Sequence, residues 1–234
     1  MGVKVRKLGQ EKAGAIIAAA GSSQRMGGVD KIFALIAGKP LLAYVLDVFQ
    51  QCQAIHQMVI VLSEANLEQG QRLVEKQGFP KVTGICPGGE RRQDSVAAGL
   101  KKLRGCHWVV IHDGARPCLS SDLIEQGLKE AQQSGAAIAA VPVKETIKTV
   151  KADGTIKYTP RRESLWVAQT PQIFRWDIIT EAYRQGKGEA PDDAALVEAL
   201  GYKVKIYMGS YDNIKVTTSE DLALAEIILK QQGM

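Results

Sequence analysis

The sequence predicts an α/β fold of three layers, in which a doubly wound and mostly parallel sheet lies between helices and a β-hairpin arm protrudes. Three observations predict it. Short apolar runs alternate with amphipathic segments, which is the pattern of strand and helix units in a parallel sheet. Glycine-rich or charged loops follow several of the apolar runs, where such sheets bind their ligands. The alternation is interrupted once, after Pro142, by a hairpin signature.

The length and composition suit one folded unit. With 234 residues and 45% hydrophobic content, the chain can bury the core of a single domain, which we place at residues 14–234 with its hairpin arm at about 144–165. We expect residues 1–13, which carry charges but no apolar segment of signal-peptide type, to form a disordered leader.

Charge and cysteine usage exclude several classes of protein. The 30 Lys+Arg and 25 Asp+Glu give a net charge of +5 without a basic block, which favours phosphorylated small molecules over nucleic acid. No apolar run approaches the roughly 18 residues of a membrane span. The four cysteines show no C-x-x-C spacing, so they indicate reduced thiols in a cytoplasmic protein rather than zinc ligands or disulfides.

The first half of the chain begins with the apolar strand Ala15 to Ala18. Pro40 to Gln50 follows as a helix, because its apolar residues recur at helical spacing behind a proline suited to a helix start. Met58 to Leu62 is a continuous apolar run and predicts a buried strand. Leu67 to Gln77 is then predicted as a helix and Lys81 to Cys86 as a strand.

The same pattern then repeats. Gln93 to Leu103 predicts a helix, and Trp108 to His112 predicts another buried strand. Asp122 to Ser134 predicts the next helix, and Ala136 to Val141 a strand that ends at Pro142. Strands that alternate with helices in this way indicate a parallel sheet with its ligands at the carboxyl ends of the strands.

The hairpin signature consists of two β-prone segments, 146–150 and 155–159, on either side of Asp153-Gly154. An exposed ribbon of two strands is marginally stable by itself. We therefore expect it to pack on a second copy of the chain in a homodimer; the alternative is that it folds back on its own domain.

The last third returns to helices and one strand. Helices are predicted near 176–185 and 192–200, and a strand at 203–208. The helix predicted at 219–232 has acidic residues in its first turn, which suit the positive end of the helix dipole.

The loop after the first strand carries small residues and then cations. Main-chain N–H groups near Gly21 can form an anion-binding nest, and Arg25 and Lys31 would neutralise the bound anion. The spacing matches neither a P-loop nor a dinucleotide fingerprint. The alternative is an ordinary turn with two solvated cations.

Further polar clusters follow other strands. Ser95 stands at a helix start behind two glycines and could donate to a base or phosphate, or simply cap the helix. Asp113 suits a Mg²⁺ or ribose contact and Arg116 a phosphate contact, unless the two form a salt bridge. Lys215, between a strand and the last helix, could reach the same phosphates.

Together these motifs resemble one family, the 2-C-methyl-D-erythritol 4-phosphate cytidylyltransferases of the non-mevalonate isoprenoid pathway. They are nucleotidyltransferases of Rossmann-like, glycosyltransferase-A-like fold. The resemblance runs from Ala15 to Leu229. It rests on six motifs in the family's order: AAGSSQRMG with Lys31, GGERRQDSV, HDGARP, Pro142 to Thr146, LWVAQTPQ, and DNIKVT followed by EDLALAE.

The resemblance implies how CTP is bound and activated. The first loop would hold the triphosphate and the GGERRQDSV motif would recognise cytosine, through Ala19, Ala20, Gly21, Gly89, Glu90, Ser95 and Asp113. Catalytic roles are implied for Arg25, Lys31 and Lys215, which would stabilise charge around the α-phosphorus. The implied cofactor is Mg²⁺, bound by the CTP phosphates with Asp113 as the candidate protein ligand.

The resemblance also implies the second substrate, a polyol phosphate acceptor. The implied acceptor contacts are Asp113, Arg116, Thr146, Arg162, Thr170 and Lys215. Arg162 would reach the partner subunit's site from the hairpin arm, in agreement with the expected homodimer. No nucleic acid or membrane partner is implied.

The chemistry implied is attack of the acceptor phosphate on the α-phosphorus of CTP, with release of pyrophosphate. That phosphate is already ionised near neutral pH, so no general base is needed. The low number of histidines, three in the whole chain, agrees with such a mechanism. We expect His112 to be structural.

The sequence departs from the family's usual pattern at four positions. These are Glu90, Ile32, Gly114 and Pro191, where Asp, Gln, Ala and Thr are common. Two alternative functions remain: a ribitol 5-phosphate cytidylyltransferase, and a non-catalytic nucleotide-binding protein of the same fold, which the presence of Arg25, Lys31, Asp113 and Lys215 disfavours.

Overall fold

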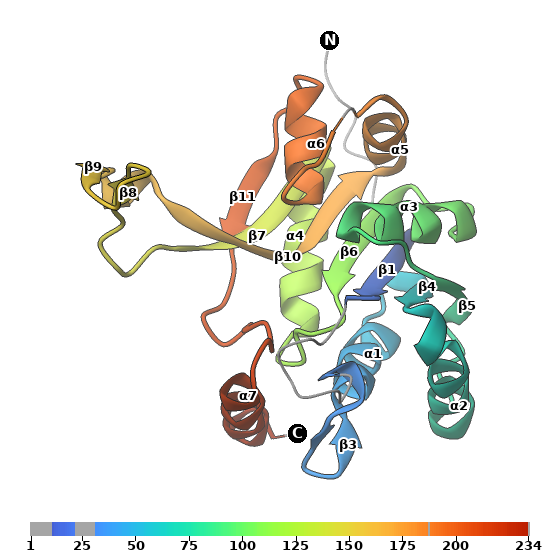
Figure 1. Ribbon diagram of the computed structural model, residues 1–234. Coiled ribbons are helices and arrows are strands. Elements are labelled where there is room, and N and C mark those ends of the chain that lie inside the picture. Colours follow the sequence, from blue (N-terminus) through green and yellow to red (C-terminus); the bar gives the residue numbers. More distant parts are fainter. Residues whose placement is uncertain (1–10, 22–30, 187, 234) are drawn as a thin grey trace.

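Figure 1 shows the computed structural model of the chain, which describes residues 11–21, 31–186 and 188–233. Residues 1–10 of the expected leader lie outside the described residues. Residues 11–13 do not belong to a disordered leader, which corrects the predicted boundary. Glu11 accepts a hydrogen bond from the indole N–H of Trp108 at 2.7 Å, and Ala13 is the buried first residue of the first strand.

The core of the molecule is a sheet of seven strands in the order β11-β7-β10-β6-β1-β4-β5. Every neighbouring pair is parallel except the two pairs formed by β10, so the sheet is mostly parallel, as predicted. The strands are β1 Ala13–Ala19, β4 Ile55–Leu62, β5 Val82–Pro87, β6 Trp108–Asp113, β7 Ala136–Pro142, β10 Trp166–Arg175 and β11 Lys205–Met208.

Helices cover both faces of this sheet and make the three predicted layers (Figure 1). One face packs on α1 Leu41–Gln51, α2 Leu67–Gln77 and α4 Ser121–Ser134. The other face packs on α3 Arg92–Lys102, α5 Trp176–Gln185 and α6 Asp193–Ala199. Side chains of β1 point alternately to the two faces of the sheet. Ala15 and Ile17 pack among the buried residues on the first face, and Ile16 packs among those on the second.

The last helix, α7 Ser219–Gln231, lies outside these two layers. Its buried residues Ala225, Ile228 and Leu229 form a smaller core with the start of α1. A small hairpin of β2 Leu35–Ile36 and β3 Lys39–Pro40 precedes α1 and was not predicted. Among the described helices none is both long and apolar enough to cross a membrane.

The longest strand of the sheet, β10, was not predicted from the sequence. Its centre, Gln169 to Gln172, is polar and contains Pro171, which cannot donate to a strand ladder. The pairing with β7 shifts between Ala168 and Gln172, so the proline falls in an irregular part of the strand. The buried Ile173 and Phe174 follow this irregularity and anchor the strand in the core.

The hairpin signature after Pro142 corresponds to β8 Thr149–Val150 and β9 Ile156–Tyr158, an antiparallel pair shorter than the predicted strands. Asp153 accepts from the Thr155 N–H at 2.9 Å, and Gly154 has a φ of 81°. In Figure 1 this pair stands well away from the seven-stranded sheet, at the end of the segments that leave β7 and enter β10.

Candidate active site

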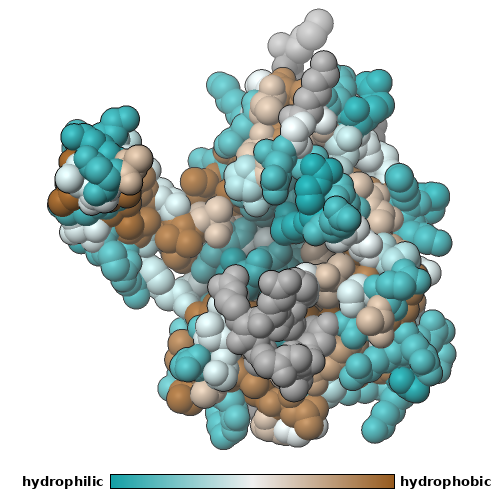
Figure 2. All heavy atoms as spheres, in the orientation of Figure 1, coloured by the Kyte–Doolittle hydropathy of each residue, from teal (hydrophilic) through white to brown (hydrophobic). Residues whose placement is uncertain are grey.

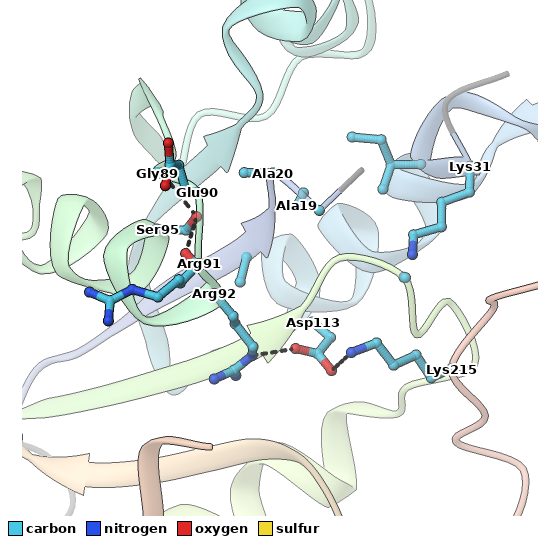
Figure 3. A pocket seen from close by; sticks show the side chains of 14 residues that line it. Ala19, Ala20, Lys31, Gly89, Glu90, Arg91, Arg92, Ser95, Asp113 and Lys215 are labelled. Atoms are coloured by element: carbon cyan, nitrogen blue, oxygen red, sulfur yellow. Dashed lines mark hydrogen bonds and ion pairs between the residues drawn. The ribbon is translucent and has the colours of Figure 1, made fainter. Parts of the chain in front are cut away.

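A pocket of about 340 Å³ opens at the carboxyl ends of β1, β5 and β6, as expected for a parallel sheet (Figure 3). Loops from distant parts of the sequence meet there because neighbouring parallel strands end at the same edge. The predicted site residues that line this nucleotide pocket, as we call it, are Ala19, Ala20, Gly21, Lys31, Gly89, Glu90, Ser95, Asp113 and Lys215. Arg25 lies outside the described residues.

A second pocket of about 440 Å³ adjoins the first and is here called the acceptor pocket. Both pockets are lined by Arg92, Asp113 and Lys215. The acceptor pocket adds two of the predicted residues, Arg116 and Thr170. The carboxylate and the two cations therefore stand where a group bound in one pocket would meet a group bound in the other.

The Asp113 carboxylate lies between three cations. It accepts from Arg92 Nε at 3.1 Å, Lys215 Nζ lies 3.0 Å from Oδ2, and Arg116 Nε lies 3.5 Å from the same oxygen. Figure 3 shows Arg92, Asp113 and Lys215 in one row. Burial by itself would raise the pKa of Asp113, but the cations outweigh it and hold that pKa well below its ordinary value. The carboxylate is therefore ionised at neutral pH.

The predicted alternative for Asp113 and Arg116, a mutual salt bridge, is thus present as one part of a larger cluster. Arg116 also donates to the main-chain oxygen of Asn213 at 2.8 Å, which links it to the segment carrying Lys215. Val216 N donates to Ala115 O at 2.8 Å and ties that segment to the loop after β6. These bonds hold Lys215 beside Asp113, although its side chain is 41% exposed.

The glycine-rich loop after β5 is folded tightly against the first loop. A Cβ atom on Gly88 would lie 2.4 Å from the Ala20 Cβ, so a glycine is required for this approach. Ser95 accepts from Gly89 N at 3.2 Å and donates to Arg91 O at 3.2 Å. The helix cap is formed by Arg91 and Asp94, so Ser95 does not cap α3. Its hydroxyl instead orients the loop that lines the nucleotide pocket.

Three residues that were not predicted as site residues, Arg92, Asp193 and Tyr183, extend the cluster around Asp113. Arg92 donates to Asp193 Oδ2 at 2.7 Å, so its guanidinium bridges Asp193 and Asp113. Tyr183 donates its hydroxyl to the other oxygen of Asp193 at 2.5 Å. Burial raises the pKa of Asp193, and the adjacent Arg92 opposes that rise. Arg92 lies within the GGERRQDSV motif, but no pattern in the sequence marks Asp193 as its partner.

His112 also belongs to the site's support. Its ring is fully buried, and burial lowers its pKa to about 4, so it is neutral near pH 7. It lies within β6, which agrees with the structural role predicted for it.

Thr146 and Arg162 are not brought to either pocket by this chain. Both are exposed, and Arg162 donates to Lys144 O at 3.0 Å within the arm segment. Pro191, one of the departures, lines the acceptor pocket beside Asp192.

Comparison with known proteins decides the family. The sequence model described as 2-C-methyl-D-erythritol 4-phosphate cytidylyltransferase matches residues 13–231. The chain belongs to this family. It is thereby a cytidylyltransferase, one of the nucleotidyltransferase enzymes, and the resemblance drawn from the six motifs is confirmed.

Relatives and solved structures of this family match along almost the whole chain. A protein of that name from Dehalococcoides mccartyi is 54% identical over 221 residues, covering 94% of this chain and 97% of the relative. The crystal structure of 4-diphosphocytidyl-2C-methyl-D-erythritol synthase from Anaerococcus prevotii has a TM-score of 0.84 at 30% identity, covering 94% of this chain and 96% of the other. A bifunctional relative from Desulforudis audaxviator is 43% identical, and the match spans 92% of this chain and 56% of that protein.

Proposed function

We propose that the protein transfers CMP from CTP to the phosphate of 2-C-methyl-D-erythritol 4-phosphate, giving 4-diphosphocytidyl-2-C-methyl-D-erythritol and pyrophosphate. The observation that carries the proposal is the pair of adjoining pockets that share Asp113 and Lys215, in a member of this family. CTP would occupy the nucleotide pocket and the polyol phosphate the acceptor pocket. The reacting phosphates would then meet at the shared residues.

The chemistry that these residues support is phosphoryl-type transfer by positioning and charge. An oxygen of the acceptor phosphate attacks the α-phosphorus, the bond to the β-phosphate breaks, and pyrophosphate leaves. Lys31 and Lys215, with Arg25, would stabilise the negative charge that spreads over the phosphate oxygens. His112 cannot serve as a base because it is buried and bonded within the protein. The nucleophile is ionised already and requires no base.

The donor set suits a magnesium ion only if the substrate supplies most of its ligands. Glu90 and Asp113 are the carboxylates lining the nucleotide pocket, and the described residues hold no group of three potential metal ligands. Mg²⁺ is commonly bound by one or two carboxylates together with substrate phosphates. We propose that Asp113 contributes the protein ligand. The ion would neutralise phosphate charge when bound.

We further propose that the folded residues form one nucleotidyltransferase domain, and that two copies form a homodimer through the hairpin arm. Exposed apolar side chains support this: Val150 and Ile156 of the hairpin are each 58% exposed, and Val167 at the base of the arm is 51% exposed. Figure 2 shows hydrophobic side chains gathered along the arm. Contact with a second copy would bury them and would bring Thr146 and Arg162 to the partner's acceptor pocket.

We also infer a cytoplasmic location. All four cysteines are free and buried, as expected of thiols in a reducing compartment.

The proposed reaction is tested by measuring pyrophosphate release with Mg²⁺ and CTP while the acceptor is varied between 2-C-methyl-D-erythritol 4-phosphate and ribitol 5-phosphate. We expect turnover with the former and little with the latter. Turnover with ribitol 5-phosphate alone would assign the alternative function. Binding of CTP without turnover of either acceptor would support the non-catalytic alternative.

A further inference from the structure

The hairpin arm joins the domain through a narrow ribbon of two strands. Pro142 at the end of β7 pairs with Trp166 at the start of β10, and Val143 N donates to Leu165 O at 3.0 Å. Beyond this point the arm extends away from the seven-stranded sheet (Figure 1). A ribbon of two strands twists and bends easily, so main-chain pairing alone does not fix the direction of the arm.

A third segment of the chain contacts this ribbon from the side. It follows β11 and contains Tyr211, whose hydroxyl donates to Pro142 O at 2.8 Å. The ammonium group of Lys144 lies 3.5 Å from the centre of the Tyr211 ring, which makes a cation–π contact. One side chain therefore holds the segment that leaves β7 at two points, two residues apart.

The main chain on both sides of Tyr211 is anchored to β10. Ser210 O accepts from Gln169 Nε2 at 2.8 Å, and the buried side chain of Asn213 donates to Thr170 O at 2.8 Å. The base of the Tyr211 side chain therefore cannot follow the arm when the arm moves. A ring held in this way acts as a brace between the domain and the ribbon.

The braced segment determines where the arm's predicted acceptor contacts lie. Arg162 donates to Lys144 O at 3.0 Å, and Thr146 follows Lys144 by two residues. A shift of Lys144 would therefore move both contacts. Tyr211 itself is not among the residues that line the nucleotide or the acceptor pocket, so the structure gives it no direct contact with a substrate bound there.

We propose that Tyr211 is a positioning residue that sets the direction of the hairpin arm through its contacts with Pro142 and Lys144. It thereby sets the place where Thr146 and Arg162 enter the acceptor pocket of the partner subunit. The kinetic consequence rests on the proposed reaction and homodimer, whereas the direction of the arm does not.

The direction of the arm is tested by pulsed electron paramagnetic resonance between spin labels on Ala152→Cys, near the hairpin turn, and Lys101→Cys on α3. Both positions are exposed and the four native cysteines are buried, so the labels attach selectively. An excess of unlabelled protein keeps each measured pair within one chain. We expect a narrow range of distances, which Tyr211→Leu broadens clearly. An equally narrow range in Tyr211→Leu would overturn the proposal, whether or not the protein is active.

The kinetic consequence is tested by steady-state pyrophosphate release. We expect Tyr211→Leu to lower kcat/KM for the acceptor about fivefold to thirtyfold, because the arm must then be ordered on binding, while the KM for CTP stays within about twofold. Tyr211→Phe removes the hydroxyl alone and Lys144→Gln the cation alone, and each should give part of the loss. Lys144→Arg keeps the cation and should behave like the unmodified protein. A change in the KM for CTP alone would contradict the role of Tyr211.

Mixed dimers show whether Tyr211 acts through the arm or through the site of its own chain. A dimer of a Lys31→Ala chain and an Arg162→Ala chain would have one working site, which combines the pocket of the Arg162→Ala chain with the arm of the Lys31→Ala chain. Tyr211→Leu should lower kcat/KM for the acceptor when it is added to the Lys31→Ala chain, and should have little effect in the other.

The reverse pattern would overturn the action through the arm. If the two parent variants do not restore activity to each other, or if the unmodified protein does not turn over, the proposed homodimer or the proposed reaction fails. The distance measurement would still decide whether Tyr211 sets the direction of the arm.

Discussion

At the scale of single residues, the site concentrates positive charge around one carboxylate. Asp113 is buried and ionised because Arg92, Lys215 and Arg116 surround it. A carboxylate in this position keeps the cations fixed, so that they need not reorganise when phosphate charge develops near them. Lys31 also lines the nucleotide pocket and comes from a different segment of the chain (Figure 3).

Removal of one of these cations is expected to slow the reaction strongly. Lys31→Ala should lower kcat by about a hundredfold or more, and Arg25→Ala likewise, because each removes preorganised charge at the triphosphate. Lys101→Ala, at an exposed lysine on α3, is the matched control and should turn over at the normal rate. Steady-state pyrophosphate release measures all three. A Lys31→Ala enzyme with normal kcat would refute the role of Lys31.

His112 predicts a pH dependence of stability. Its pKa is about 4 in the folded protein against 6.5 for the free side chain, so between these values the unfolded chain binds a proton that the folded protein does not. Stability is therefore fully present above pH 6.5 and is lost as the pH falls toward 4, by up to about 3 kcal/mol. Urea unfolding of the metal-free protein at several pH values measures this loss.

The variant His112→Gln isolates that contribution, since all other titrating groups remain. Its free energy of unfolding should fall less steeply with acidification than that of the unmodified protein. Equal slopes for the two proteins would show that His112 is not the buried neutral ring described above.

The buried pair of Arg92 and Asp193 predicts a second effect on stability. Asp193→Asn should cost about 2–4 kcal/mol, because the buried guanidinium of Arg92 loses one of the two carboxylates that compensate its charge. Glu198→Gln, at an exposed residue of the same helix, should change stability by less than about 0.5 kcal/mol. Chemical unfolding compares the two, and equal losses would contradict the importance of the pair.

At the scale of elements, packing within the chain does not explain the stability of the hairpin arm. β8 and β9 are short and carry exposed apolar side chains, among them Val150 and Ile156, and a ribbon of this kind gains little stability by itself. We proposed that a second copy covers it. If so, Arg162 acts in the site of the partner subunit, and each active site draws on both chains.

Mixing two inactive variants tests this sharing of sites. Lys31→Ala fails in its own site, and Arg162→Ala fails in the partner's. A mixed dimer would hold one site with both residues intact and one site with both residues changed. Random mixing makes about half of the dimers mixed, so about a quarter of normal activity should return. If Arg162 acts within its own chain, every site of the mixed dimer stays defective and no activity returns. Mixing Arg162→Ala with unmodified protein controls for subunit exchange.

At the scale of the whole molecule, local sequence patterns were sufficient for most of the sheet and helices. Continuous apolar runs such as Met58 to Leu62 favour buried strands, and this run lies within β4, which begins three residues earlier, at Ile55. β10 was missed because its polar centre and Pro171 carry no strand pattern. It is held in place by its neighbours β6 and β7, which no local pattern reveals.

Which residues meet at the strand ends could be predicted in the same way, while the roles given to them stay predictions. Nine of the residues implied by the six motifs line one pocket, because strand ends of a parallel sheet converge. Asp193 and Tyr183 were not predicted, since they support Arg92 from elements far along the chain. The hydrogen bond between the Thr170 hydroxyl and His112 was also not predicted, because it depends on the orientation of a buried ring.

The most direct test of cytidylyl transfer follows the oxygen atoms. The acceptor, 2-C-methyl-D-erythritol 4-phosphate, is labelled with ¹⁸O in its phosphate group and incubated with the protein, CTP and Mg²⁺, and the products are analysed by mass spectrometry. We expect all of the label in a diphosphocytidyl product and none in the pyrophosphate, because the acceptor oxygen attacks the α-phosphorus. Label in the pyrophosphate, or the absence of any product containing CMP, would contradict the proposed reaction.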